Sequence, residues 1–184
     1  MKTMVVLGIA SVLLGGCAAM SEAECRTGDW YGVGEKDGRD GQKDKLSDYA
    51  EACQKIGVLP NPGEYSRGRE RGLLAYCTPA NGYRVGRDGQ SYHNVCAPEL
   101  QDGFLREYEV GRARYELQRD IAGLESDLQS WGRQIDKLNE QIGKAQSDDE
   151  RNKLRRDRDG YERQRRDGQI RLTVLRARWL VQGD

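Results

Sequence analysis

The sequence predicts an all-α protein: a small disulfide-stapled helical domain made of two duplicated units, followed by a long antiparallel coiled-coil hairpin. Two patterns predict this fold class. Residues 25–115 carry four cysteines, and their glycines and tyrosines recur at helical spacing. Residues 116–184 carry apolar residues at alternating steps of four and three, which is the heptad pattern of a coiled coil.

Residues 1–16 are typical of the signal peptide of a bacterial lipoprotein. One basic residue, Lys2, precedes an apolar run from Met4 to Leu14 that is too short to span a bilayer. The tetrad LGGC is close to a lipobox, so we expect cleavage before Cys17 and a lipid anchor on that cysteine. Alanine at position 18 favours sorting to the outer membrane. Residues 17–24 would be a short lipidated tether, and the protein would face the periplasm.

Four more cysteines remain in an exported chain, which implies two disulfides and three alternative pairings. They are Cys25, Cys53, Cys77 and Cys96. A zinc site is disfavoured because no CxxC pair is present and the chain has one histidine. We therefore expect no metal and no cofactor. Pairing within each unit, Cys25 with Cys53 and Cys77 with Cys96, is preferred because a duplicated module should carry its own staple, while crossed pairing stays open.

The cysteine-containing region aligns with itself, which indicates an internal duplication. Counted from their cysteines, the copies place these pairs in register: Tyr31 with Tyr83, Gly34 with Gly86, Tyr65 with Tyr108, and Gly68 with Gly111. The second copy is shorter. The two units are predicted to cover about residues 25–76 and 77–115.

Two strings within the first unit have helical periodicity. One face of DWYGVGEKDGRDG carries Trp30, Gly34, Gly38 and Gly41, and one face of EYSRGRERGLLAY carries Tyr65, Gly68, Gly72 and Tyr76. Glycine inside a helix costs up to about 1 kcal/mol relative to alanine, so such rows need a compensating contact. Close helix approach, with tyrosine rings over the bare backbone, supplies it. We expect two short helices joined by a loop in each unit, with a cysteine near the start of each helix.

The combined cysteine and glycine spacing resembles that of a proteobacterial lipoprotein family known as domain of unknown function 2799. The resemblance covers residues 25 to about 115 and is carried by Cys25, Asp29, Trp30, Tyr31, Gly34, Asp37, Gly38, Gly41, Cys53, Tyr65, Gly68, Gly72, Leu73, Tyr76, Cys77, Gly86, Gly89, Tyr92 and Cys96. It implies an envelope protein and adds no activity, substrate or catalytic residue.

The heptad pattern of residues 116–184 predicts two helices that fold back on each other. The first seam consists of Leu117, Ile121, Leu124, Leu128, Trp131, Ile135, Leu138, Ile142 and Ala145. Ser147 and Glu150 then form an SxxE capping pattern that starts a second helix. The weaker second seam consists of Leu154, Tyr161, Leu172, Leu175 and Trp179. A turn at 147–149 would place Leu124 opposite Leu172.

Charge favours this intrachain hairpin. Residues 116–150 contain nine acidic and four basic side chains, whereas residues 151–178 contain eleven basic and four acidic ones. Helices of opposite sign attract across a seam. The rival is a homodimer through the first helix, because isoleucine and leucine alternate there as in parallel dimers.

Catalysis and nucleic-acid binding are not expected. His93 is the lone imidazole, and no catalytic residue is assigned. Glu35 with Asp37, and Asp88 beside Arg87, are interpreted as solvated faces of short helices rather than as acid and base pairs. A formal net charge of zero and an exported location argue against a nucleic-acid partner.

We therefore predict a structural or protein-interaction module anchored to the outer membrane, whose coiled coil docks to another envelope protein. The alternative is a module that binds peptidoglycan or another glycan through an aromatic platform. Its candidate ligand-binding residues are Trp30, Tyr31, Tyr65, Tyr83, Tyr92 and Arg87.

Overall fold

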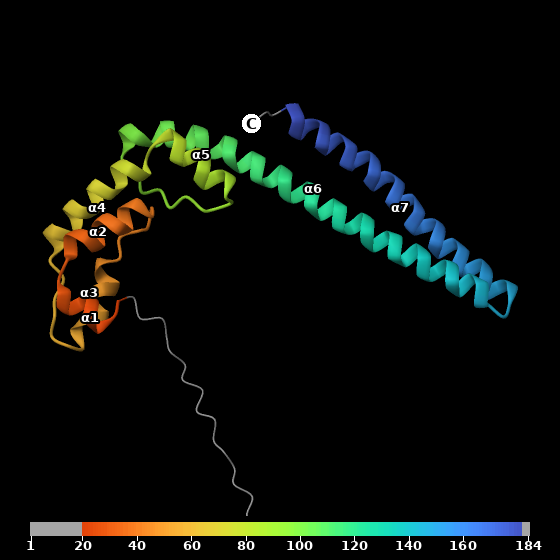
Figure 1. Ribbon diagram of the computed structural model, residues 1–184, viewed down its shortest axis with the longest axis horizontal. Coiled ribbons are helices and arrows are strands. Elements are labelled where there is room, and N and C mark those ends of the chain that lie inside the picture. Colours follow the sequence, from red (N-terminus) through yellow and green to blue (C-terminus); the bar gives the residue numbers. More distant parts are fainter. Residues whose placement is uncertain (1–19, 182–184) are drawn as a thin grey trace, which may run out of the picture. The chain divides into compact units, whose positions relative to one another are not determined.

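The structure is a computed structural model that describes residues 20–181, and every helix in this range is an α-helix (Figure 1). The chain divides into two compact units, Met1–Tyr76 (unit 1) and Cys77–Asp184 (unit 2). Unit 1 holds α1 (Glu22–Thr27), α2 (Trp30–Arg39), α3 (Leu46–Gln54) and α4 (Pro62–Tyr76); unit 2 holds α5 (Pro79–Arg87), α6 (Pro98–Lys144) and α7 (Asp148–Val181). No strand occurs in residues 20–181, so the predicted all-α class is confirmed.

Helices α2 and α4 form the centre of unit 1, and local sequence signals set their ends. The carboxylate of Asp29 caps α2 by accepting a hydrogen bond from the Gly32 amide at 2.9 Å. Helix α4 starts at Pro62, and the Asn61 side chain accepts a hydrogen bond from the Glu64 amide at 3.1 Å. Both predicted helical strings therefore form helices that lie against each other (Figure 1).

Unit 1 has two short helices, α1 and α3, that the sequence did not predict. They carry Cys25 and Cys53, which form a disulfide. The prediction of two helices with a cysteine near each start is therefore wrong for this unit, because the cysteines occupy two further helices. Both cysteines pack in one core cluster with Trp30 of α2 and Tyr65 of α4. The disulfide lies in a core with Met20 and Trp30.

Unit 2 begins with a simpler arrangement, in which Cys77 and Cys96 form the second disulfide. Cys77 precedes α5, whose N-cap is Thr78, and Cys96 precedes α6. Here each cysteine lies just before a helix, as predicted. The structure therefore holds the pairing within each unit, and crossed pairing is excluded.

Glycines bring the helix backbones of both units close together. A β-carbon on Gly38 of α2 would lie 2.3 Å from the carbonyl oxygen of Arg69 on α4. In unit 2, a β-carbon on Gly86 of α5 would lie 2.1 Å from the carbonyl oxygen of Tyr108 on α6. Such distances leave no room for any side chain, so the expected reason for the glycine rows is confirmed.

The structure places the duplication one helical turn away from the predicted register. The pentapeptide GRDGQ occurs at 38–42 and again at 86–90, and both copies end a helix in the same way. Gly41 and Gly89 have positive φ, and the rings of Tyr76 and Tyr115 cover them. The matching pairs are Gly38 with Gly86, Asp37 with Val85, Tyr65 with Phe104, Gly72 with Gly111, and Tyr76 with Tyr115. Glycine recurs about once per helical turn in both copies, so an alignment shifted by one turn still pairs glycine with glycine. The alignment counted from the cysteines is shifted in this way.

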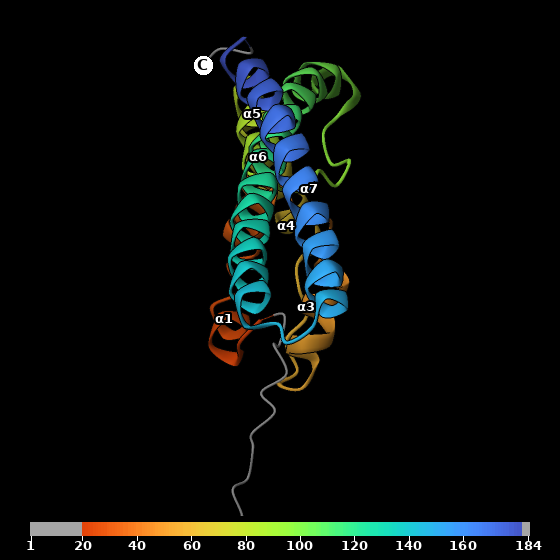
Figure 2. The same ribbon diagram turned by 90° about the vertical axis from the view of Figure 1, so that its right-hand side faces the viewer.

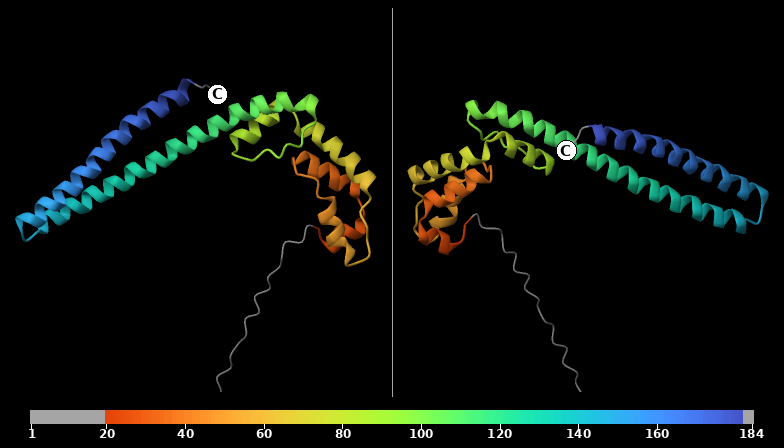
Figure 3. Two further views of the ribbon diagram at one scale, coloured as in Figure 1. Left: turned by 180° about the vertical axis from the view of Figure 1, so that it is seen from behind. Right: turned by 45° about the horizontal axis from the view of Figure 1, so that its top comes forward.

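Helices α6 and α7 form the predicted antiparallel hairpin, seen from two directions in Figures 2 and 3. Leu124 and Leu172 are buried between them, and a β-carbon on Gly168 would meet the rings and methyls of Trp131, Leu128 and Leu124. Glu125 and Arg176 form an ion pair of 2.7 Å across the seam. Helix α6 runs without a break from 98 to 144, so the predicted boundary at 115/116 falls inside one helix.

Candidate functional site

Unit 1 contains the one buried charged side chain among residues 20–181. Asp37 on α2 is 6% exposed, and its Oδ2 accepts hydrogen bonds from the hydroxyls of Tyr49 at 2.8 Å and Tyr65 at 2.9 Å. The Tyr65 hydroxyl also accepts a hydrogen bond from the Lys45 amide at 3.1 Å. Because these residues come from α2, α3, α4 and the loop before α3, the cluster ties all of these segments together.

Burial changes the acidity of both tyrosines. Burial first, and the hydrogen bond to Asp37 second, raise the pKa of Tyr49 above its ordinary value. Burial also raises the pKa of Tyr65, to about 12; the Lys45 amide opposes the rise and Asp37 adds to it. Both hydroxyls are therefore neutral donors at neutral pH. Carboxylate and hydroxyls satisfy one another inside the core, so the cluster stabilises the fold rather than presenting an acid or base to a substrate.

The sequence predicts that Glu35, Asp37 and Asp88 lie on solvated helix faces, and this is wrong for Asp37 and confirmed for Glu35 and Asp88. The expectation that Asp37 lies on a solvated face is wrong, because the two tyrosine hydroxyls replace water around it. Glu35 does pair with Arg39 on the surface at 2.7 Å, and Asp88 pairs with Arg87 at 3.3 Å. His93 is exposed, as expected for a surface residue.

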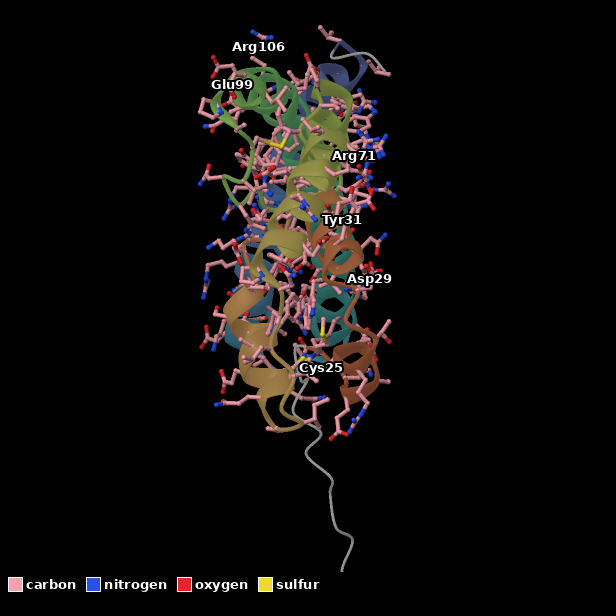
Figure 4. All side chains as sticks on the ribbon, turned by 90° about the vertical axis from the view of Figure 1, so that its left-hand side faces the viewer. Cys25, Asp29, Tyr31, Arg71, Glu99 and Arg106 are labelled. Carbon is pink, nitrogen blue, oxygen red and sulfur yellow. A yellow bond between two sulfur atoms is a disulfide. The ribbon has the colours of Figure 1, made fainter. Side chains whose placement is uncertain are left out.

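The candidate glycan-binding residues of unit 1 do not share a surface. Trp30 and Tyr65 are buried in the core around the disulfide, so their rings offer no face to a ligand. Tyr31 is 39% exposed, and Figure 4 labels it on α2, some way along unit 1 from Cys25. Burial therefore leaves one exposed ring of the three predicted in this unit.

The candidates in unit 2 are partly covered by their own neighbours. The Arg87 guanidinium lies 5.9 Å from the ring centroid of Tyr83, a cation–π distance. The half-buried Tyr92 ring lies 4.8 Å from the ring of Phe104, and its hydroxyl accepts a hydrogen bond from the Cys96 amide at 3.1 Å. These rings fill the space beside the helices, which is the packing role that the glycine gaps require.

The hairpin of unit 2 carries a groove of about 790 Å³ between α6 and α7. Its lining is mixed and includes Asp120, Gly123, Trp131, Ile170, Val174 and Leu175. Beyond the neighbouring residues and the local backbone of α6, no atom lies within 4 Å of the position that a β-carbon on Gly123 would take, so the α6 side of the groove is open. The α7 side is formed by Ile170, Val174 and Leu175, with the basic Arg171 among them.

Exposed apolar side chains extend from this groove along α7. Ile170 is 65% exposed and Val174 is 62% exposed, and Val181 follows at a helical spacing of seven. These three residues, called here the α7 strip, lie on a different face from the seam residues Leu172 and Leu175. A helix that is apolar on two faces normally packs against two neighbours, and in the described part of the chain α6 is the helix that packs extensively against α7.

Basic side chains lie beside the α7 strip and in line with it. Arg163, Arg171 and Arg178 are exposed on α7, and within residues 20–181 their guanidinium groups form no hydrogen bond and no ion pair. Sequence reasoning missed the strip because it sorted α7 by its seam alone. The signal was present in the segment IRLTVLRARWLV at 170–181, which is too apolar for a helix with a single buried face.

The described residues bear in part on the expected absence of a metal and on membrane attachment, and not on the predicted lipidation site. Residues 20–181 hold no group of three or more histidine, cysteine, aspartate or glutamate side chains that could bind a metal ion. In the same range no helix has the length and hydropathy that a membrane span requires. Cys17, the predicted lipidation site, and the signal residues 1–16 lie outside the described residues.

Comparison with known proteins gives one match. Searches of the curated proteins and of the solved structures found no significant match. Residues 29–113 match the family model described as "Protein of unknown function (DUF2799)". The matched range begins at the N-cap of α2 and ends inside α6, so it includes both glycine-packed helix pairs and leaves out α7. Over residues 29–113 the chain is therefore similar to the DUF2799 family, whose function is unknown.

Proposed function

We propose that the protein is an outer-membrane-anchored periplasmic lipoprotein that acts as a protein-interaction module without catalytic activity. The observation that carries this proposal is the α7 strip, whose members Ile170 and Val174 are each more than 60% exposed beside an open groove. Apolar side chains that a helix exposes in a row mark docking surfaces for another helix.

The surroundings of the strip define the chemistry of the partner. Arg171 and Arg178 lie beside the strip and Arg163 lies in line with it, so the surroundings of the strip are positively charged. A matching surface is an amphipathic helix with an apolar face and acidic flanks, because opposite charges at the rim of a helix contact select and orient the partner. We therefore propose an envelope protein that presents such a helix.

The rest of the chain suits a support for this surface. Two disulfides and close glycine contacts hold the helix pairs, and α7 extends for 34 residues, or about 50 Å. A lipid anchor at Cys17 would keep the module at the membrane. The hairpin would then reach a partner within the periplasm.

A cross-linked pull-down from intact envelopes tests the proposal with the full-length chain. The test variant carries Ile170→Ser and Val174→Ser, and the matched control carries Leu74→Ser, which alters an exposed leucine of unit 1. All these positions are exposed, so folding should change by no more than about 0.5 kcal/mol. We expect the parent and the control to recover the same partner and the double variant to lose it. Equal recovery by all three would refute docking through the strip.

A further inference from the structure

The chain enters unit 1 at a buried methionine close to the predicted lipid anchor. Met20 is buried, and its sulfur lies 3.7 Å from the sulfur of Cys53. The next residue, Ser21, caps α1 in a reciprocal capping box with Glu24. Structure that is fixed to the core therefore begins three residues after Cys17.

This entry point sets how far unit 1 can stand from an anchored Cys17. Three residues of fully extended chain span at most about 11 Å. If Cys17 is acylated, as the proposed function requires, Met20 is held within about that distance of the lipid headgroups. The inference below therefore rests on the proposed anchor. Residues 20–24 of the predicted tether belong to the folded unit, so residues 17–19 are the ones left to link it to the anchor.

An apolar loop lies at the same end of unit 1 as Met20. The Val58 amide donates a hydrogen bond to the carbonyl oxygen of Cys53 at 3.3 Å, and Val58 packs against the core cluster that contains Met20. The following residue, Leu59, is 76% exposed. The loop follows α3, which lies together with α1 at this end of the unit (Figure 1). Figure 4 labels Cys25 of α1 there.

We propose that this end of unit 1 rests on a lipid bilayer, with the Leu59 side chain inserted at the boundary between the headgroups and the acyl chains. The short reach from Cys17 brings the end to the membrane, and Leu59 then exchanges water for the apolar boundary of the lipid. This end carries the acidic Glu22 and Glu24 together with the basic Arg26 and Lys55, so the lipid surface that fits its mixed charge is zwitterionic. Two attachment points, Cys17 and Leu59, would fix the orientation of unit 1 on the membrane.

Tryptophan quenching by brominated lipid tests the contact. The lipidated full-length protein is reconstituted into phosphatidylcholine vesicles whose lipid carries bromine near the headgroup end of the acyl chains. Leu59→Trp is compared with Leu74→Trp, an exposed leucine of the same unit near the far end of α4, about 18 Å along that helix from its start. Emission from each introduced tryptophan is taken as the increase over the unsubstituted protein.

We expect the bromolipid to quench strongly the emission added by Leu59→Trp and to leave that added by Leu74→Trp unchanged. Equal quenching of both, or quenching of neither, would overturn the proposal. The intact mass of each preparation is measured first. Loss of the acyl mass would refute the anchor, and with it the proposed location, whereas an acylated protein without selective quenching would refute the membrane contact alone.

Discussion

Helices α2 and α4 of unit 1 contact each other through glycines, and helices α5 and α6 of unit 2 do so in the same way. The two pairs differ in the side chains that fill the space beside the contact. In unit 1 the residues next to the contact are Asp37 and Tyr65, joined by a hydrogen bond of 2.9 Å. In unit 2 the matching residues are Val85 and Phe104, which are both fully buried and apolar. One backbone arrangement thus supports a polar core in one unit and an apolar core in the other.

This difference shows which part of the duplicated design is constrained. The glycine contacts leave no space for a β-carbon in either unit, so they tolerate no exchange. The neighbouring core positions tolerate exchange when both partners change together. A carboxylate without its tyrosine hydroxyls, or hydroxyls without their carboxylate, would leave a buried polar group unpaired.

Filling the glycine contact should have the largest effect, in both units alike. Gly38→Ala and Gly86→Ala should each lower the free energy of unfolding of their own unit by about 3 kcal/mol, because the new methyl meets backbone that cannot move aside. Urea unfolding, followed by Trp30 emission for unit 1 and by Trp131 and Trp179 emission for unit 2, measures this. As the control, Gly123→Ala in an open part of α6 should be neutral or stabilising by up to about 1 kcal/mol. Comparable effects at all three glycines would contradict the close approach.

Removing a disulfide should have an effect of similar size and should separate the units. The bridges join residues 28 and 19 positions apart, so replacing either pair by serine should cost its unit about 3 kcal/mol. Loss of Cys25–Cys53 should shift the unfolding transition reported by Trp30. Loss of Cys77–Cys96 should leave the α6–α7 seam helical in circular dichroism, since the seam closes without the bridge. A coupled collapse of both units in either variant would argue against separate staples.

Transplanting the apolar pair into unit 1 should have a smaller and partly reversible effect. Asp37→Val copies Val85 and strands the hydroxyls of Tyr49 and Tyr65, at a cost of about 2 kcal/mol in the free energy of unfolding. Adding Tyr65→Phe, which copies Phe104, should recover part of that loss. Chemical denaturation of the single and double variants gives the coupling energy. Strictly additive losses would mean that the two positions are not partners.

Alkaline pH should weaken unit 1 through Tyr65. Its folded-state pKa is raised to about 12 from an ordinary value of 10, so the unfolded chain loses its proton first. The contribution of Tyr65 is fully present below about pH 10 and is lost as the pH rises toward about 12. Thermal unfolding across this window should show a steeper loss for the parent than for Tyr65→Phe. Identical pH profiles would show that the hydroxyl ionises as freely in the fold as in water.

Local periodicity was sufficient to predict the long helices. It did not predict which residues of different helices contact one another. The glycine row of α2 and the heptads of α6 repeat with the period of the helix, so they indicate helices without further information. The burial of Asp37 depends on hydroxyls that α3 and α4 supply, and no local pattern reports that. The register of the duplication was within reach through GRDGQ, but α1 and α3 separate the cysteines of unit 1 differently from those of unit 2. Predicting the α7 strip would have required recognising that α7 has a second apolar face besides the seam.

Site-specific photo-cross-linking in intact envelopes tests the central claim, that unit 2 binds a protein partner through α7. A benzophenone amino acid replaces Val174 in the strip or, as the matched position in unit 1, Leu74. Both side chains are more than half exposed, so exposure alone cannot separate them. We expect a discrete adduct of higher mass at position 174 and none at position 74. An adduct at position 74 with none at 174, or equal labelling at both, would contradict it.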